Sequence, residues 1–404
     1  MVHDLRNSAA RRIEGWSVMK RSTDRVLTTH TGSLPRPSDL LELLRERESG
    51  AEGFNDEAFA AKVRSSVQGV LRKQAEAGVD AVSDGEQSKL SFFHYIRDRL
   101  SGMEGHADRP LNMYEDFPGY QAWQAQRRGN TGAMAFSRPA CVGPLGWKDK
   151  QALEADIANV KRALDDVAAE EGFLPSASVG IVAQRMENRY YSTYEAYVEA
   201  IAEVMADEYR AIVDAGLVLQ IDAPEMCIDR NLPEFRERPL SDFRARMELW
   251  VEALNHALTG IPEEQVRFHV CWGNGEGPHT GDVPLRDIVD IVLKVHAAAY
   301  SVEASNPRHA HEWTVWQDVK LPEDKVLIPG VIDSVTNFVE HPELVAQRIV
   351  RYADLVGREN VIAGTDCGFG TGAFAVNVYP PIVWGKLAAL SAGAGIASKQ
   401  LWRS

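Results

Sequence analysis

Cysteine is scarce in this chain, which has only four among 404 residues. They lie far apart in the sequence, at positions 141, 227, 271 and 367. Disulfide frameworks belong mainly to short secreted chains that are dense in cysteine, so this pattern argues against one. Each cysteine is therefore expected to be a packing residue, a free thiol or a metal ligand.

Long apolar runs and basic clusters are also missing. No stretch of about 18 apolar residues occurs, so no membrane span is expected. Fifty-eight acidic residues outnumber forty-four basic ones and give a formal net charge of −14, which makes nucleic acid and anionic membranes poor partners. An arginine pair near the start has no apolar stretch behind it, so no secretory signal is expected. We expect a cytoplasmic protein with a flexible leader over residues 1–22 and a single domain over residues 23–404.

Short β-branched runs alternate with amphipathic stretches along the chain. Residues 56–79 and 193–216 repeat apolar side chains every three or four positions and end at or near glycine, which is typical of helices. A strand followed by a helix, repeated about eight times, predicts an α/β protein with the (β/α)₈ architecture of a TIM barrel. The strand candidates are residues 25–33, 80–86, 138–144, 176–183, 217–225, 266–272, 299–305, 326–333 and 360–368.

The candidate strands outnumber the eight positions of such a barrel by one. We assign residues 138–144 to an aromatic and polar insertion from about 91 to 148, because residues 176–183 lead more regularly into the next helix. A doubly wound open sheet is the alternative, but no Gly-x-Gly-x-x-Gly turn follows the first strand. The sequence therefore favours one elaborated barrel.

Polar residues gather where the predicted strands end, and that end of a barrel carries the functional groups. His269 and Cys271 share one face of their strand because side chains alternate with a period of two. Glu303 and Cys367 end later strands at the same rim. A histidine nitrogen, two thiolates and a carboxylate suit tetrahedral zinc. The rim also carries His30, Ser33, Asp84, Glu86, Asp222, Glu225, Asp333 and Asp366.

The alternative for any one cysteine is simple packing, and His-x-Cys alone is a weak motif. Cys141 and Cys227 lack a set of partners like that of Cys271, and we interpret them as packing residues. Structural zinc sites usually contain paired Cys-x-x-Cys motifs, whereas ligands scattered over several strands favour an open catalytic site. Such a site can bind a substrate thiol and hold it as a thiolate.

Seven motifs occur together in the order and spacing of a known family: "TTHTGSLPRP", "SDGEQSK", "LQIDAPE", "HVCWGN", "VEASNPRHAHEW", "IPGVID" and "GTDCGFGT". From about residue 25 to 398, the chain resembles the catalytic barrel of cobalamin-independent methionine synthases and their shorter relatives, which include epoxyalkane:coenzyme M transferases. The resemblance implies zinc ligands at His269, Cys271, Glu303 and Cys367. It also implies amino-acid-binding residues at Ser33, Glu86 and Asp222.

Two departures from the family pattern concern the alkyl donor. The family's longer members have a histidine shortly after the strand that ends in "IPGVID", where this chain has Ser334, Val335 and Thr336. The tryptophan on which their pterin stacks also has no evident match. Four further residues are candidates for substrate contact or acid–base roles. They are His30, Asp333, Arg308 and His309, the last two in a loop that is otherwise expected to be solvated.

Three functions remain open at this stage. The first is methyl transfer from a 5-methyltetrahydrofolate-type donor to homocysteine or a similar small thiol, which Glu86 and Asp222 favour because they suit an ammonium group. The second is opening of an epoxide by a zinc-bound thiol such as coenzyme M, which the two departures favour. The third is a zinc-binding barrel without catalysis. The first is the function we expect, with Zn²⁺ as cofactor, a small thiol and an alkyl donor as partners, and an open question over the oligomeric state.

Overall fold

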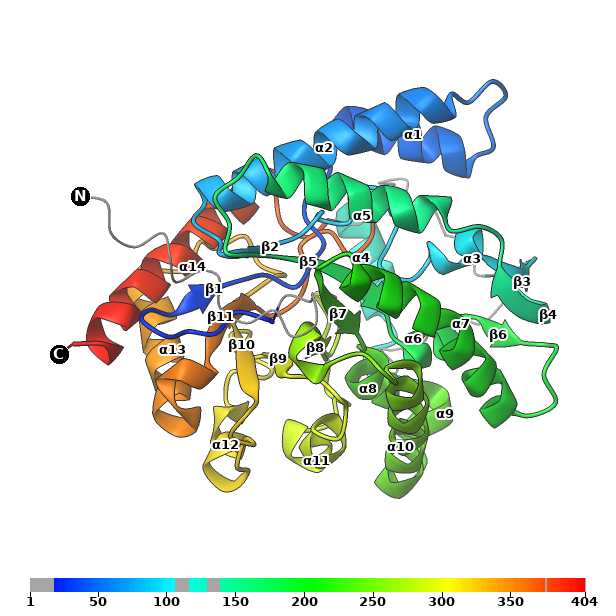
Figure 1. The fold of residues 1–404 in the computed structure, drawn as a ribbon. Coiled ribbons are helices and arrows are strands. Elements are labelled where there is room, and N and C mark those ends of the chain that lie inside the picture. The colour runs from blue at the N-terminus through cyan, green and yellow to red at the C-terminus, as the bar shows by residue number, and fades with distance from the viewer. Residues whose placement is uncertain (1–17, 106–115, 129–138, 375, 404) are drawn as a thin grey trace.

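The structure is a computed structural model that describes residues 18–105, 116–128, 139–374 and 376–403. Its centre is an eight-stranded parallel sheet surrounded by helices (Figure 1). The strands follow the order β1-β11-β10-β9-β8-β7-β5-β2 around the sheet. A backbone hydrogen bond of 3.1 Å from Asp80 N to Thr28 O links the two outer strands and nearly closes the barrel. The predicted (β/α)₈ TIM barrel is thereby confirmed.

The barrel strands are short and buried, and each continues into a loop at the rim. They are β1 (Leu27–Thr28), β2 (Ala81–Val82), β5 (Glu171–Ala177), β7 (Val218–Asp222), β8 (Val266–His269), β9 (Ala299–Glu303), β10 (Val326–Ile332) and β11 (Ile362–Thr365).

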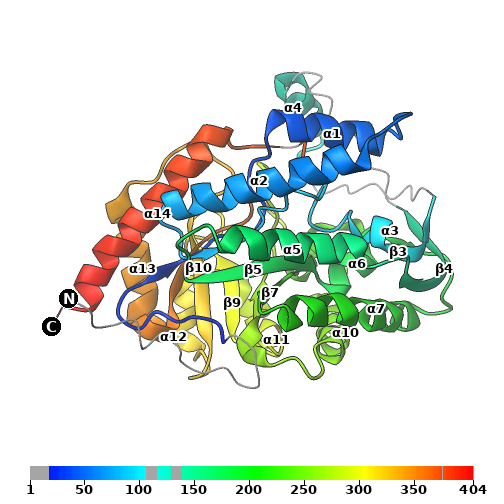
Figure 2. The ribbon, with the colours of Figure 1, turned by 45° about the horizontal axis from the view of Figure 1, so that its top comes forward.

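Helices cover the outer face of the barrel (Figure 2). Two of the long helices start where a side chain caps them: Asn55 accepts from Ala58 N, and Thr193 accepts from Ala196 N. The helices are α1 (Ser38–Glu48), α2 (Asp56–Glu76), α3 (Ile96–Arg99), α4 (Tyr120–Arg128), α5 (Gln151–Leu164), α6 (Val179–Arg185), α7 (Tyr194–Asp214), α8 (Glu225–Ile228), α9 (Pro233–Arg236), α10 (Leu240–Ala257), α11 (Val289–Val292), α12 (Val315–Asp318), α13 (Pro342–Val356) and α14 (Pro380–Leu401). Within the described ranges, none of them is both long and apolar enough to cross a membrane.

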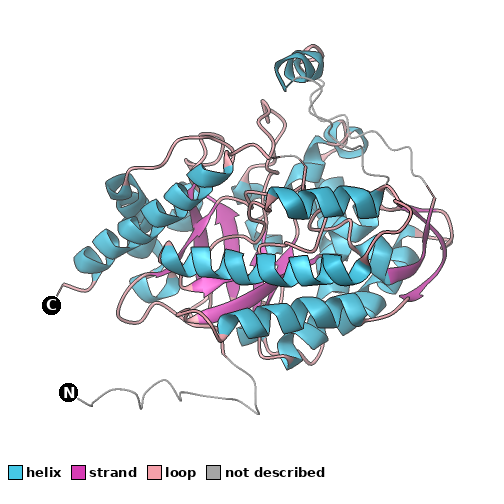
Figure 3. Ribbon diagram, turned by 90° about the horizontal axis from the view of Figure 1, so that it is seen from above, coloured by secondary structure: helices cyan, strands magenta, loops and turns pink. Residues whose placement is uncertain are grey.

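The insertion predicted at about 91–148 forms an addition to the barrel. It contains α3, α4 and two strands, β3 (Leu100–Glu104) and β4 (Ala140–Trp147). β4 pairs antiparallel with β3 and parallel with β6 (Glu187–Asn188), so it is the extra strand that the sequence predicted outside the barrel. Helix α4 stands away from the barrel when the molecule is viewed from above (Figure 3).

The strand predicted at residues 176–183 is wrong for most of its length. The barrel strand β5 ends at Ala177, and the apolar residues that follow form helix α6. Ser178 causes the change, because its hydroxyl caps the helix by accepting from Ile181 N at 2.9 Å. Residues 179–185 are buried throughout, so their apolar character carried no sign of helical periodicity.

The end of the predicted leader lies against the barrel. Residues 1–17 are outside the described part of the chain, but residues 18–22 follow its surface. Met19 N donates to Glu264 O at 2.9 Å, and the Ser22 hydroxyl donates to Val361 O at 2.6 Å. Met19 also joins a buried apolar cluster with Leu27 and Phe173.

A buried ion pair fastens α14 to the loop that follows β10. Lys386 is fully buried, and its Nζ lies 3.0 Å from both carboxylate oxygens of Glu340. Glu340 Oε1 also accepts from Asp333 N at 2.9 Å. Removing one partner of a buried pair leaves the other charge uncompensated, which is strongly destabilising.

We predict that Lys386→Met lowers the free energy of unfolding by about 3–5 kcal/mol. The double variant Lys386→Met with Glu340→Gln should recover much of this loss, because the glutamine is neutral and still accepts from Asp333 N. Denaturant titration measures both. Lys294→Met, which removes an exposed pair with Glu248, is the control and should cost less than about 1 kcal/mol. Equal losses for Lys386→Met and Lys294→Met would contradict the prediction.

Candidate metal centre and substrate site

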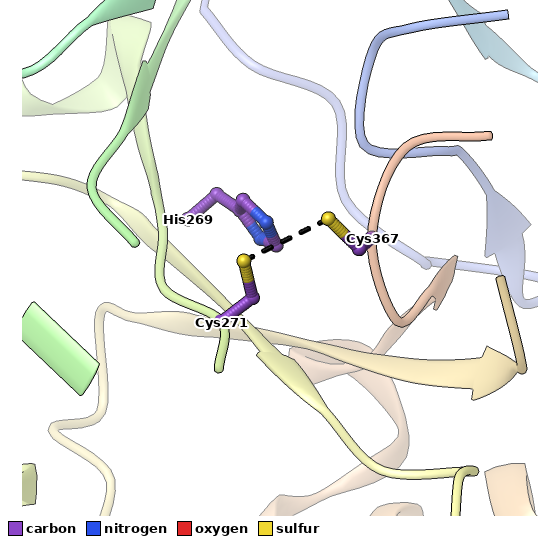
Figure 4. Close-up of side chains that lie close together, drawn as sticks. All are labelled: His269, Cys271 and Cys367. Carbon is purple, nitrogen blue, oxygen red and sulfur yellow. Dashed lines mark hydrogen bonds between the residues drawn. The ribbon is translucent and has the colours of Figure 1, made fainter. Parts of the chain in front are cut away.

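Three of the predicted zinc ligands meet at the rim of the barrel (Figure 4). His269 ends β8, Cys271 follows two residues later, and Cys367 follows the end of β11. Their ligand atoms all lie within 4.8 Å of one another, and the two sulfur atoms are 3.7 Å apart. All three residues are buried. In the described ranges, this is the group of histidine, cysteine and acidic side chains with the spacing of a metal site.

The neutral state of His269 suits a metal ligand. Burial, with a smaller contribution from the Arg267 charge, lowers the pKa of His269 to about 3, so its imidazole is neutral. Its Nε2 is buried without a hydrogen-bond partner among the described residues. The hydrogen bond to Cys367 and burial raise the pKa of Cys271 well above its usual value. A bound cation is what would hold these thiols as thiolates, and a nitrogen with two sulfurs fits zinc.

The fourth predicted ligand, Glu303, lies outside that group of three. Its Oε1 accepts from Trp272 N at 2.8 Å, and its Oε2 accepts from the Asn306 amide and from Arg308 at 3.3 Å. Burial raises the pKa of Glu303 to about 7, although the Arg308 charge opposes this. In this arrangement Glu303 supports the strand that carries Cys271, and its role as a ligand stays a prediction.

Two residues without a predicted role hold the metal-binding loops together. Asn274 donates through its side-chain amide to Gly368 O, next to Cys367, and its Oδ1 accepts from the Ser334 hydroxyl at 3.1 Å. Asp366 accepts from the backbone N–H groups of residues 304, 305 and 306 at 2.8–2.9 Å. These bonds join the loops after β8, β9, β10 and β11. The one signal in the sequence was their place beside Cys271 and Cys367.

The three predicted amino-acid-binding residues lie around the same centre. Asp222 pairs in register with His269 on the neighbouring strand. The Ser33 hydroxyl accepts from Gly370 N at 3.3 Å, and its carbonyl accepts from Phe369 N, so it contacts the loop after Cys367. Glu86 lies close to Gly32, the residue before Ser33, because a Cβ atom added at Gly32 would lie 3.3 Å from Glu86 Oε1. The structure thus places Asp222 beside the candidate ligand His269, Ser33 against the loop that follows Cys367, and Glu86 near Gly32.

Glu86 and Asp222 are buried carboxyl groups whose pKa values are raised. Burial raises the pKa of Glu86 to about 7 against the opposing charges of Lys89 and Arg36. Burial and the charge of Glu86 raise the pKa of Asp222 well above its usual value. Glu86 Oε2 is buried without a hydrogen bond among the described residues, 3.9 Å from Arg36. Glu86 also has a φ of 56°, which is uncommon for a residue other than glycine. A positively charged ligand would relieve both carboxylates.

Of the acid–base candidates, Asp333 and the Nε2 of His30 are hydrogen-bonded within the protein, whereas the Nδ1 of His30 is buried without a partner among the described residues. His30 Nε2 bonds to Gln74 Oε1 at 2.7 Å, and burial lowers its pKa to about 3 despite that bond. Asp333 accepts from Val335 N at 3.1 Å and from the Thr336 hydroxyl. Both residues organise loops of the rim in this structure, and their roles toward a substrate stay predictions.

Arg308 and His309 lie in a packed loop. The sequence analysis had kept a solvated loop as the alternative. Arg308 donates to the carbonyls of Gly273 and Gly275 at 3.4 Å each. The His309 ring stacks on Trp272 with 3.9 Å between centroids, and its two nitrogens bond to Asp282 and Glu312 at 3.0 Å each. Burial opposes protonation of His309, but these two bonds raise its pKa to about 9. The loop therefore braces the strand end that carries Cys271.

Comparisons with known proteins relate the chain to methionine synthases. Residues 183–376 match the family described as the catalytic domain of cobalamin-independent synthase. The methionine synthase of Thermococcus kodakarensis is 25% identical over 344 residues, covering 84% of this chain and 86% of the relative. The methionine synthase of Pyrococcus horikoshii is 25% identical over 342 residues, covering 84% and 85% of the two chains.

The same fold occurs in a solved structure of a B12-independent methionine synthase from Shewanella sp. W3-18-1 in complex with selenomethionine. The TM-score is 0.71 at 20% identity, with 93% of this chain and 99% of that chain covered. The chain is thus similar to the catalytic domain of cobalamin-independent synthase over residues 183–376 and, over most of its length, to curated methionine synthases.

Proposed function

We propose that this protein is a zinc-dependent methyltransferase that converts homocysteine, or a similar small thiol, into its methyl thioether. The donor is of the 5-methyltetrahydrofolate type. The observation that carries the proposal is the convergence of His269, Cys271 and Cys367 beside two buried carboxylates. Curated relatives named methionine synthase support the reaction type, and a neighbour of the same fold was solved with selenomethionine.

Zinc at this site would lower the pKa of an added substrate thiol and keep it ionised at neutral pH. Glu86 and Asp222 would hold the substrate ammonium, since two buried carboxylates without enough positive charge favour a cation. The thiolate sulfur then bonds to the methyl carbon, while the bond from that carbon to the donor nitrogen breaks. The electron pair stays on the donor nitrogen, which takes up a proton.

Epoxide opening by a sulfonate thiol such as coenzyme M is the second candidate. It is favoured by the segment of Ser334, Val335 and Thr336, which has no histidine where the family's longer members have one. Here the Ser334 hydroxyl donates to Asn274 Oδ1, so it braces the metal-binding loops. A screen of thiol consumption distinguishes the candidates. Homocysteine and coenzyme M are each incubated with methylfolates and with small epoxides, with and without zinc.

We predict that the purified protein binds about one zinc ion per chain. Cys271→Ser and Cys367→Ser should each lower the zinc content strongly, because a serine oxygen is a poorer ligand for this metal than a thiolate. Cys141→Ser is the control, since Cys141 is a buried residue of β4 outside the group. Metal analysis of the three variants measures the effect. The same zinc content in all three would remove the proposed centre.

We predict that Asn274→Ala weakens zinc binding by about 10- to 100-fold, the usual effect of removing a residue that orients metal ligands. The variant loses the bonds that connect the loop after Cys271 to Gly368 and Ser334. Competition with a chelator measures the dissociation constant. Asn255→Ala, which removes an amide that bonds to Lys294 O on the outer surface, is the control. Unchanged zinc affinity in Asn274→Ala would show that the ligands hold their own positions.

We predict that Glu86→Gln lowers kcat/KM for homocysteine by about 10- to 150-fold, because a charge-assisted hydrogen bond to the ammonium is lost. Use of coenzyme M, which has no ammonium, should stay the same or improve. A homocysteine activity that is indifferent to the substitution would refute the amino-acid site.

The same residue predicts a pH dependence. The pKa of Glu86 is raised to about 7, so its carboxyl group is mostly protonated below that pH. Only the ionised carboxylate pairs well with an ammonium group. Affinity for methionine should therefore rise with pH up to about 7 and level off above it. Methionine is the suitable ligand because it has no titrating thiol. Calorimetric titration across this range should show the rise for the wild type and a weaker one for Glu86→Gln.

A further inference from the structure

A cavity of about 120 Å³ lies next to the residues that follow Ser33 and Glu86 in the sequence. The proposed methyl transfer makes no use of it. Helix α2 forms one wall, and Trp384 of α14 and the loops of Pro35 and Gln87 complete it. This space is several times what a single water molecule needs. The cavity is therefore large enough for a small ligand.

Six residues of α2 line the cavity, and four of them follow one face of the helix: Lys62, Ser66, Gly69 and Lys73. Their spacing of four, three and four residues places them in one stripe. Lys73 Nζ lies 5.2 Å from the centroid of the Trp384 ring, and Lys62 pairs with Asp39 of α1. With one carboxylate for two ammonium groups, the wall keeps a net positive charge, which favours an anion.

Two buried polar atoms of the lining residues have no partner among the described residues. They are the hydroxyl oxygen of Ser66, which is 5% exposed, and Oε1 of Gln87, which is fully buried. Gln87 Nε2 faces the carbonyls of Leu34, Pro35 and Gly85 at 3.2–3.5 Å, which fixes the orientation of the amide. A ligand that satisfies Gln87 must donate to its Oε1, whereas the Ser66 hydroxyl can donate to the ligand or accept from it.

Gly69 leaves this space open. Glycine inside a helix is destabilising by roughly 0.5–1 kcal/mol relative to alanine. A Cβ added at Gly69 would meet no atom within 4 Å, so packing does not require glycine there. A side chain at this position would project from the wall that lines the cavity.

We propose that this cavity binds a small oxyanion that carries a hydroxyl group, such as hydrogen phosphate or a hydroxycarboxylate. The two lysines supply the positive charge, the Ser66 hydroxyl donates to an anionic oxygen, and Gln87 Oε1 accepts from the ligand hydroxyl. The site is separate from the metal centre, although Gln87 adjoins Glu86 in sequence.

Calorimetric titration of the zinc-loaded full chain tests the proposal, with inorganic phosphate and lactate as probes. Sulfate and acetate are the matched anions without a hydroxyl at neutral pH. We expect saturable one-to-one binding of phosphate or lactate, and which of the two binds more tightly identifies the class. Sulfate or acetate should bind about tenfold or more weakly than the matching probe, because Gln87 would lack a donor. Absence of saturable binding by both probes, or equal binding of the matched anions, would overturn the proposal.

Two variants assign the binding to this cavity. Gly69→Met fills the space and improves the helix, and Lys73→Met removes a cation, so each should weaken binding about tenfold or more. The controls are Gly395→Met, at another open helical glycine on α14, and Lys161→Met, an exposed lysine of α5. Neither control lines the cavity. Binding that is unaffected by Gly69→Met and Lys73→Met would place the anion elsewhere and overturn the proposal.

Discussion

The close approach of two thiols from strands that are not neighbours is the constraint on which this site depends. β8 and β11 are separated in the sheet by β9 and β10, yet Cys271 and Cys367 bring their sulfur atoms within 3.7 Å. Both cysteines lie beyond the strand ends, so the loops determine this distance. Asn274 and Asp366 fix those loops by bonding to the backbone of neighbouring segments. The metal site is therefore a property of a loop network anchored on a barrel.

Glu86, one of the predicted substrate-binding residues, is likewise supported by the surrounding loops. Glu86 is held in a left-handed conformation with a φ of 56°, and Arg36 donates to its carbonyl at 2.7 Å. Holding a residue in such a conformation costs about 1–3 kcal/mol and requires that its surroundings determine it. Burial also keeps its pKa near neutrality, at about 7. Strain and desolvation are concentrated at a carboxylate that would be stabilised by a bound cation.

The sequence was informative where local rules control the outcome. The alternation of strands and helices predicted the barrel, whereas the strand predicted to carry both His269 and Cys271 ends at His269. The sequence was misleading at residues 176–183, because a helix buried on every side has the same apolar composition as a strand. The roles of Asn274 and Asp366 were also beyond sequence reasoning. They depend on which backbone groups four distant loops present to them, and such contacts leave no periodic signal.

The sheet order also has a consequence for synthesis on the ribosome. β1 pairs with β11, so the barrel cannot close until the last strand of the sheet has been made. Cys367 follows that strand, which means that a nascent chain holding His269 and Cys271 lacks the third ligand until closure becomes feasible. Contacts of such long sequence separation form slowly. A metal ion held by these three residues would therefore be captured only as the fold is completed, because unfinished chains offer an incomplete set of ligands.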